Sequence, residues 1–306
     1  MSDHPTQNVG LGIALILATA LTISVQDLVF KLFSGSLTLA QIFALRGVIA
    51  FAMLTAIVAL RGPSVGVLHE AVRLWPLLRA LCITMAFLTF YAAIPFLSLS
   101  TIGAAFYIAP IFVALISAGV IGERVGGLGW LGVLVGFAGV IVLLQPGSDA
   151  FSGFAVLPVV GAILYAVGNV ITRTRCQGVP VEVLSLSQNG MMMTAGLAIS
   201  IILVVLAPRG ALVDAYPYLF GLWSTVGLID VLILTLLAVF AVSLGMMLSS
   251  AYKLAPPAIV ATFEYSYLVF VAMWDILFFG LTPTVASLTG MAMIIAAGLL
   301  VMRGRG

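Results

Sequence analysis

The sequence predicts an all-α integral membrane protein with ten transmembrane helices in an inverted 5+5 repeat. Hydrophobic residues fill 63% of the 306 positions and charged residues only 7%, whereas a soluble domain carries about 25% charge. Apolar runs of about 20 residues, enough to cross a bilayer core, recur along the chain. Lipid permits only helices or closed barrels. The runs lack the alternation of barrel strands, so helices are predicted.

Each helix is placed on one apolar run, with its ends at neighbouring charges, glycines and prolines. The predicted helices are Gly10–Phe30, Leu37–Leu60, Leu74–Ile94, Leu97–Gly119, Leu128–Leu144, Phe154–Thr172, Val183–Leu206, Leu228–Tyr252, Ala258–Phe279 and Thr284–Met302. The aromatic stretch Ala211–Trp223 is broken by Pro217, so we expect an interfacial segment there. The first run is interpreted as a retained helix, because no basic region precedes it and it exceeds a signal-peptide core.

Basic residues lie mainly on one side of the predicted bundle. With the amino end in the cytoplasm, only Lys31 and Arg209 fall on the outer side. The inner loops and tail hold Arg61, Arg73, Arg124, Arg173, Arg175, Lys253, Arg303 and Arg305. Because basic loops stay inside, both termini are predicted to be cytoplasmic. The net charge is only +2 and the basic residues are dispersed, so no nucleic-acid partner is expected.

The two halves of the chain share a sparse pattern. Asp27 and Lys31 match Asn169 and Arg173 at an offset of 142 residues. The pair Arg46-Gly47 matches Asn189-Gly190 at an offset of 143. A repeat of five helices must re-enter the membrane from the opposite side, and inverted repeats are a transporter architecture with the site between the halves. We therefore divide one membrane domain into residues 1–150 and an inverted second repeat, 151–306.

Four short motifs resemble the drug/metabolite transporter superfamily, in particular its EamA-type ten-helix exporters. They are Arg46-Gly47, Arg79-Ala80-Leu81, Ile121-Gly122-Glu123-Arg124 and Phe263-Glu264-Tyr265. Ile108-Ala109-Pro110 departs from the family by lacking a Glu before the Pro, and the second half has Gly280-Leu281 in place of Gly-Glu. The resemblance implies export of amino acids or other small metabolites, aromatic amino acids included, across the bacterial inner membrane.

Ionisable residues at membrane depth are costly and usually face the bundle interior. Glu264 lies about 10 Å into its helix, where it could serve as a substrate or proton site or as the structural partner of an arginine. Arg46, near mid-depth, could neutralise Glu264, hold a substrate carboxylate or form a helix-to-helix pair. Asp275 is expected as a solvated gate residue near the outer mouth. Asp27 and Lys31, four residues apart, predict a local ion pair, with a gate role as the alternative.

Aromatic and amide side chains complete the predicted pathway. Arg79, Phe87 and Phe90 share one helical stripe, either a cationic entrance with an aromatic wall or a snorkelling arginine above ordinary core. Asn169 could bond a ligand or another helix. Aromatic residues that could line a pocket, or simply pack in the core, are Tyr107, Tyr165, Phe263, Tyr265 and Tyr267.

No catalytic motif is recognised. The sequence Gly127-Leu128-Gly129-Trp130-Leu131-Gly132 fits a dinucleotide fingerprint, but it enters a membrane helix instead of following a strand, so helix packing is expected. Cys82 and Cys176 lie at different depths, which predicts neither a disulfide nor a metal cluster. No cofactor and no metal are expected.

The predicted function is export of a small metabolite by alternating access, with amino acids as the leading class. The lipid bilayer and a small solute are the expected partners, with protons as a further candidate; the oligomeric state is open. The alternatives are an importer of a vitamin or nucleotide-like cofactor, an integral-membrane enzyme and a non-transporting scaffold. An enzyme would need clustered catalytic polar groups, and a scaffold would not need Glu264 and Arg46 at mid-depth.

Overall fold

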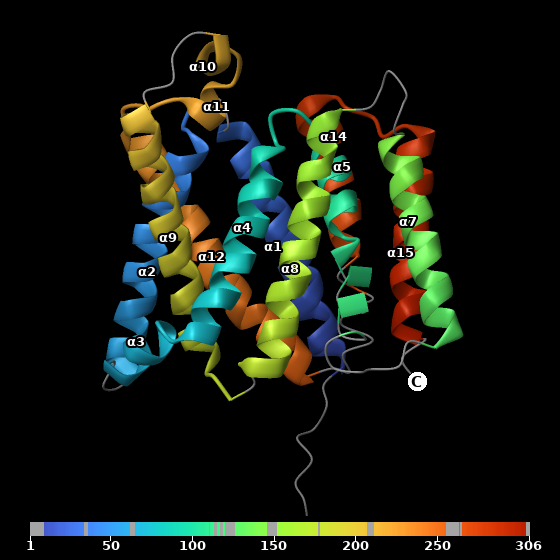
Figure 1. The fold of residues 1–306 in the computed structure, drawn as a ribbon, viewed down its shortest axis with the longest axis horizontal. Coiled ribbons are helices and arrows are strands. Elements are labelled where there is room, and N and C mark those ends of the chain that lie inside the picture. Colours follow the sequence, from blue (N-terminus) through green and yellow to red (C-terminus); the bar gives the residue numbers. More distant parts are fainter. Residues whose placement is uncertain are drawn as a thin grey trace, which may run out of the picture.

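The computed structural model describes most of the chain as a bundle of helices (Figure 1). It does not describe residues 1–8, 34–35, 62–64, 110, 113–114, 117–118, 120–125, 146–151, 177, 207–210, 255–262, 264 and 304–306. Within the described part, every regular element is a helix and no strand occurs. This confirms the predicted helical class.

Most helices follow the predicted apolar runs. The predicted continuous helix Leu97–Gly119 is wrong, because the helix ends at Phe106, and Tyr107 and Ile108 form a turn. The described helices are α1 Val9–Phe33, α2 Leu39–Arg61, α3 Val65–Ala71, α4 Leu74–Ala92, α5 Leu99–Phe106, α7 Gly127–Leu144, α8 Val156–Arg175, α9 Val181–Leu206, α10 Ala211–Ala215, α11 Pro217–Phe220, α12 Leu228–Leu254, α14 Ser266–Phe279 and α15 Val285–Arg303. A short 3₁₀ turn, Gly153–Ala155, precedes α8. The helix α3 was not predicted, because seven residues give too little periodicity.

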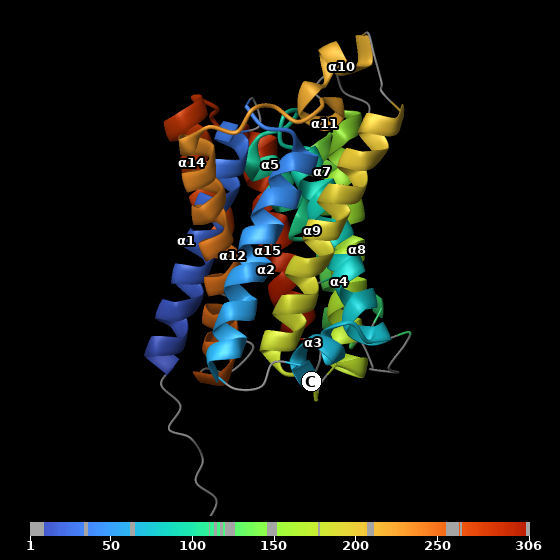
Figure 2. The ribbon, with the colours of Figure 1, turned by 90° about the vertical axis from the view of Figure 1, so that its left-hand side faces the viewer.

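Six described helices are long and apolar enough to cross a membrane: α1, α2, α4, α7, α8 and α9. Shorter apolar stretches lie in α12, α14 and α15. Together they indicate a multi-pass membrane protein. The predicted fourth and ninth spans are described only in part, so the count of ten stays a prediction. As expected, the segment after α9 forms the short helices α10 and α11 at one end of the bundle instead of a span (Figures 1 and 2).

Helices from the two halves of the chain alternate across the bundle. The helices α2 and α9 pack together at one edge, and α7 and α15 pack together at the other (Figure 1). Between these edges, α1 packs on α12 and α4 packs on α8, while α5 contacts both α8 and α14. Much of the helix packing is therefore made between the two halves.

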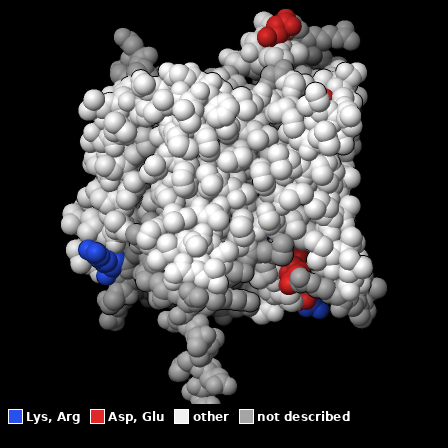
Figure 3. Space-filling model, turned by 180° about the vertical axis from the view of Figure 1, so that it is seen from behind, with Lys and Arg blue, Asp and Glu red and all other residues white. Residues whose placement is uncertain are grey.

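The outer surface between the two ends of the bundle is apolar. In the view from behind, acidic and basic side chains lie near the two ends, with a broad uncharged belt between them (Figure 3). Leu60, Val205 and Leu228 are each at least three-quarters exposed. An exposed apolar area of this extent marks an interaction surface, and lipid is the surrounding that fits a bundle of such helices.

Glycines let the paired helices approach closely. A Cβ on Gly196 of α9 would collide with the backbone nitrogen of Ala44 on α2. A Cβ on Gly139 of α7 would lie 3.1 Å from the carbonyl oxygen of Gly290 on α15. Small residues at helix interfaces have this role in membrane bundles. The glycines of the apparent dinucleotide fingerprint begin α7, a helix. Gly129 and Gly132 are buried, as expected for packing glycines, whereas a Cβ on Gly127 would meet nothing within 4 Å.

A connecting segment covers the end of the bundle at which α10 and α11 lie, called here the upper end (Figure 2). The side-chain amide of Gln41 on α2 donates to the carbonyl of Ser224 (2.8 Å), and its oxygen accepts from the Ser224 N–H (3.2 Å). The Tyr218 hydroxyl of α11 donates to the carbonyl of Tyr91 on α4 (3.3 Å). Burial raises the pKa of Tyr218 well above its ordinary value, so this donor keeps its proton.

Candidate functional site

A cavity of about 350 Å³ lies inside the bundle, where helices of both halves meet. Its walls come from α1, α2, α4 and the end of α5 in the first half and from α8, α9, α12 and α14 in the second. Along α4 it extends from Tyr91 to Arg79, twelve residues or about 18 Å of helix. A cavity of this size is typical of small-molecule sites.

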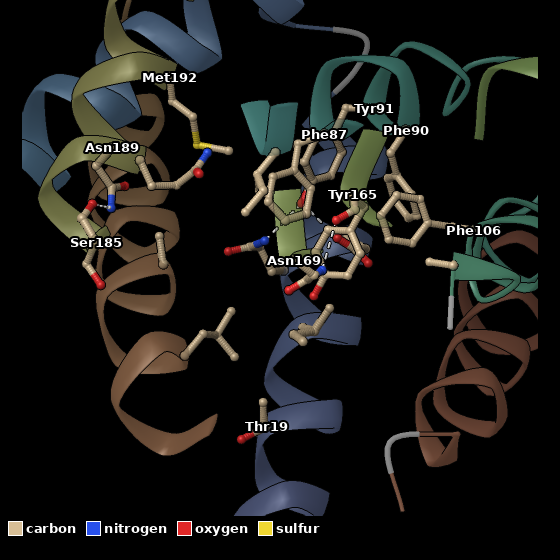
Figure 4. Close-up of a pocket in the computed structure, with 18 of the residues that line it drawn as sticks. Thr19, Phe87, Phe90, Tyr91, Phe106, Tyr165, Asn169, Ser185, Asn189 and Met192 are labelled. Atoms are coloured by element: carbon tan, nitrogen blue, oxygen red, sulfur yellow. Dashed lines mark hydrogen bonds between the residues drawn. The ribbon is translucent and has the colours of Figure 1, made fainter. Parts of the chain in front are cut away.

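One side of the cavity is a continuous group of aromatic rings, and the opposite side has both polar and apolar side chains (Figure 4). Phe87 lies 6.3 Å from Tyr91 and 6.5 Å from Tyr165, and Phe106 lies 5.3 Å from Tyr165, measured between ring centroids. The opposite side is formed by α9, which presents Ser185, Asn189 and Met192. The aromatic side can hold a flat apolar body, and Ser185 and Asn189 offer further polar contacts from α9.

Asp27 is the most strongly held polar group of the cavity. It is 2% exposed. One carboxylate oxygen accepts from the Tyr91 hydroxyl (2.9 Å), and the other accepts from the Tyr267 hydroxyl (2.6 Å). A buried carboxylate is tolerated when it is hydrogen-bonded in this way. Because Tyr91 belongs to α4 and Tyr267 to α14, Asp27 joins α1 to a helix of each half.

Arg46 is buried beside this carboxylate, at 6% exposure. Its guanidinium lies 5.5 Å from the ring centroid of Phe30 and interacts electrostatically with Asp27 and Tyr91. Its Nε atom is buried without a hydrogen-bond partner among the described residues. The cavity wall therefore contains a buried cation, one of whose donors has no partner among the described residues.

Two glutamines that the sequence analysis did not single out also have unused polar atoms. The Nε2 of Gln26 donates to the Tyr91 hydroxyl (2.9 Å), while its Oε1 has no partner within the described part of the chain. The Nε2 of Gln188 donates to Thr84 (2.9 Å), and its Oε1 is likewise unpartnered there. Both side chains line the cavity.

The lower part of the cavity contains Arg79 and Asn169. The Nε of Arg79 donates to Thr172 on α8 (2.8 Å), and an Nη donates to the carbonyl of Leu184 on α9 (3.4 Å). The Asn169 amide donates to the carbonyl of Tyr165 one turn earlier (2.9 Å). The predicted stripe of Arg79, Phe87 and Phe90 does line the cavity, and Arg79 also joins α4 to both neighbouring helices.

The ion pair at the upper end differs from the predicted one. Lys31 pairs with Asp275 of α14 (3.5 Å) and donates to the carbonyl of Leu97 (3.0 Å), while Asp27 accepts from two tyrosines. The predicted local pair of Asp27 and Lys31 is therefore wrong, because partners on other helices lie closer than one turn along α1. The prediction that Asp275 is solvated is also wrong, since its exposure is 0%.

Asp275 of α14 holds the start of α5. Its two oxygens accept from the backbone N–H groups of Leu99 (3.1 Å) and Ser100 (2.7 Å). Free N–H groups at a helix start favour such an anion. Neither Lys31 nor Asp275 lines the cavity. They therefore form a separate cluster about 6 Å above Asp27, one turn of α1 away.

Two predicted site residues are not part of the described cavity wall. Glu264, the expected polar centre, lies outside the described residues, and so does the Gly122-Glu123-Arg124 motif. Tyr265 is buried with its ring 5.9 Å from Tyr107, but it does not line the cavity. Tyr107 does line it, stacked on Tyr267 at 4.9 Å.

Sequence reasoning missed the polar residues that carry no charge. Gln26 and Gln188 lie in apolar helices and are only moderately polar, so a search for charges passes over them. Tyr91 was hidden among several aromatic residues of the third predicted span. A usable signal existed for Gln26, because it directly precedes Asp27, and two adjacent polar residues inside a span are unusual.

Comparisons with known proteins agree with this architecture. Residues 10–145 match the EamA-like transporter family. Over 202 residues the chain is 31% identical to a protein of Rhizobium johnstonii named "Riboflavin transporter"; the match covers 63% of this chain and 58% of that protein. A solved structure titled "Crystal structure of protein" shares the fold, with a TM-score of 0.57 and 18% identity over 98% of this chain and 96% of that one.

The family match contains Asp27, Arg46 and Arg79 and most of the aromatic side of the cavity. It confirms the resemblance expected from the Arg46-Gly47 and Arg79-Ala80-Leu81 motifs. Residues 10–145 of this chain are therefore similar to the EamA-like transporter family.

Proposed function

We propose that the chain is a membrane carrier that moves a small solute, with an aromatic ring and a polar end, through the central cavity by alternating access. The observation that carries this proposal is the cavity itself, which is lined jointly by both halves of a bundle with an apolar outer surface. A solute site between two halves is the expected arrangement for carriers built from repeats.

Three features support an inverted repeat of residues 1–150 and 151–306. In the repeat, α1 corresponds to α8, α4 to α12 and α5 to α14. The contact of α1 with α12 therefore corresponds to the contact of α8 with α4, and both are observed. In the same way, the contact of α5 with α8 corresponds to the observed contact of α14 with α1. The helices α1 and α8, which open the two halves, run in opposite directions across the bundle (Figure 1). Of the eight positions matched by the repeat, four line one cavity: Asp27, Arg46, Asn169 and Asn189.

Access from the upper end would require the Lys31–Asp275 cluster to open. This cluster joins α1, α14 and the start of α5 above the cavity, which supports the predicted gate role of both residues. The gate would open to the outside, because the positive-inside rule places both chain ends, and thus the lower end, in the cytoplasm. A bacterial inner membrane is the proposed location.

Two solute classes fit the cavity. Export of an amino acid, aromatic ones included, is supported by a cation and a carboxylate at one depth, Arg46 and Asp27, beside aromatic rings. A flavin-like vitamin is supported by the relative named "Riboflavin transporter". The vitamin would then be the solute of an importer.

Flux measurements in proteoliposomes test the proposal. Labelled tryptophan and riboflavin are measured in both directions, with and without a pH gradient, which also tests whether protons are a partner. We expect at least one solute to cross about tenfold faster than in protein-free vesicles, and Arg46→Gln to lower that rate about tenfold. Arg175→Gln is the matched control, since Arg175 is exposed and stacks on Trp75 away from the cavity. Equal leakage with and without protein, for both solutes, would contradict the proposal.

A further inference from the structure

We infer that Gln26 and Arg46 form a polar-head subsite, which binds a hydrogen-bond donor and an adjacent acceptor at the polar end of the solute. The inference rests on the proposed carrier function and adds the residues that select the solute. Both side chains are 6% exposed, line the cavity and have one buried polar atom without a partner among the described residues.

The orientation of the Gln26 amide follows from its neighbours. The Tyr91 hydroxyl has one proton, and it donates that proton to Asp27 (2.9 Å). Tyr91 can therefore only accept from Gln26, so the NH₂ group of Gln26 faces Tyr91 (2.9 Å) and its Oε1 faces away. These two hydrogen bonds therefore determine that the oxygen, and not the nitrogen, of the Gln26 amide is the free atom.

Arg46 supplies the matching donor at the same depth. Its guanidinium interacts with Asp27 and Tyr91, and Gln26 donates to the same Tyr91 hydroxyl, so both side chains lie beside one hydroxyl. Leaving a buried donor or acceptor unpaired costs about 1–3 kcal/mol. Two such groups beside one hydroxyl are what a site awaiting a ligand would have. Turning of the two side chains would bring these atoms into the cavity.

The chemistry of the bound group follows from this donor and acceptor. The solute must offer an N–H or O–H to Gln26 and, beside it, a carbonyl or carboxylate oxygen to Arg46. Two sources have this pattern: the ammonium and carboxylate of an amino acid, and the N–H and C=O of a heteroaromatic imide edge. In both, the aromatic rings around Phe87 and Tyr165 would hold the flat body.

Binding to purified protein in detergent tests the subsite without requiring transport. Four probes are used: tryptophan and 3-methylindole, which lacks the polar end, and riboflavin and its N3-methyl derivative, whose imide N–H is blocked. We expect the wild-type protein to prefer tryptophan or riboflavin over its partner probe by at least about tenfold. Gln26→Leu should reduce that preference to about threefold or less. The pair that shows the preference identifies the source.

Gln41→Leu is the matched control, because Gln41 is a similarly buried amide whose partner is Ser224, away from the cavity. It should leave the preference at the wild-type value. If Gln26→Leu does not fold, Gln26→Glu and Arg46→Lys are measured instead, and each should also lower the preference. An unchanged preference in the folded variants, equal binding of both members of each pair, or no binding of any probe would overturn the subsite. If the wild-type protein showed the binding preference in detergent but carried no solute in vesicles, the carrier function would be contradicted and the subsite would stand.

Discussion

At the scale of single residues, a few buried polar groups at the cavity hold each other in place. Asp27 is held by Tyr91 and Tyr267, which belong to different halves of the chain. Arg46 and Gln26 surround the same hydroxyl. The sequence alone indicated Asp27 and Arg46, because charges within apolar runs are conspicuous, but it could not show which neighbours would reach them.

Removal of one tyrosine hydroxyl tests how firmly Asp27 is held. Tyr267→Phe leaves the ring in place and removes the 2.6 Å hydrogen bond to the buried carboxylate. We expect a loss of about 1–3 kcal/mol in the free energy of unfolding, the usual effect of leaving a buried group short of a partner. Denaturant unfolding in detergent measures it.

The control for this change is Tyr216→Phe, because the Tyr216 ring packs against Phe96 and Phe154 without a hydrogen bond to its hydroxyl among the described contacts. Its unfolding free energy should change by less than about 0.5 kcal/mol. Equal effects of the two substitutions would show that Asp27 does not depend on Tyr267.

At the scale of helices, the boundaries were predicted within a few residues wherever a long apolar run begins and ends at charges or glycines. The predicted helix 128–144 is observed as α7, Gly127–Leu144. The short helix α3 and the pairing of Lys31 with Asp275 were not predictable. A helix of two turns leaves little pattern, and partners that lie in opposite halves of the sequence meet only through tertiary packing.

The close contact of α2 with α9 leads to a prediction about packing. Gly196→Ala would place a methyl group against the backbone nitrogen of Ala44, so the two helices would have to separate. We expect a loss of about 1–3 kcal/mol in stability, as for other overpacked cores. Gly127→Ala is the matched control, since a Cβ there meets nothing within 4 Å. If thermal unfolding in detergent gave the same midpoint for both variants, the close approach of α2 to α9 would not contribute to stability.

A double-mutant cycle tests the upper cluster. Lys31→Met leaves Asp275 without its cation, and Asp275→Asn leaves Lys31 without its anion, whereas the double variant leaves neither charge uncompensated. A lone buried charge is strongly destabilising. We therefore expect the sum of the two single losses in the free energy of unfolding to exceed the loss in the double variant by about 1–3 kcal/mol. Additive losses, measured by denaturant unfolding, would mean that the two side chains do not stabilise each other.

At the scale of the whole molecule, the membrane class followed from composition, because 7% charge cannot cover a soluble protein of 306 residues. The position of the cavity did not follow from composition. It depends on pairings between halves, such as α4 with α8 and α1 with α12, which no local pattern encodes. The sparse repeat gave a partial guide, since four of its eight matched positions line one cavity.

The central claim is that the cavity is reached from the two faces of the membrane in turn. The most direct test is the variant Ile23→Cys, in the cavity wall, made after Cys82 and Cys176 are replaced by serine. An impermeant maleimide is then applied from either side of oriented vesicles. Leu134→Cys on the exposed face of α7 is the control, and it should not react from either side, because lipid covers it. We predict that the Ile23→Cys variant reacts from the cytoplasmic side, and that adding Asp275→Asn to it allows reaction from the outer side as well. Reaction from neither side in both backgrounds would contradict the account.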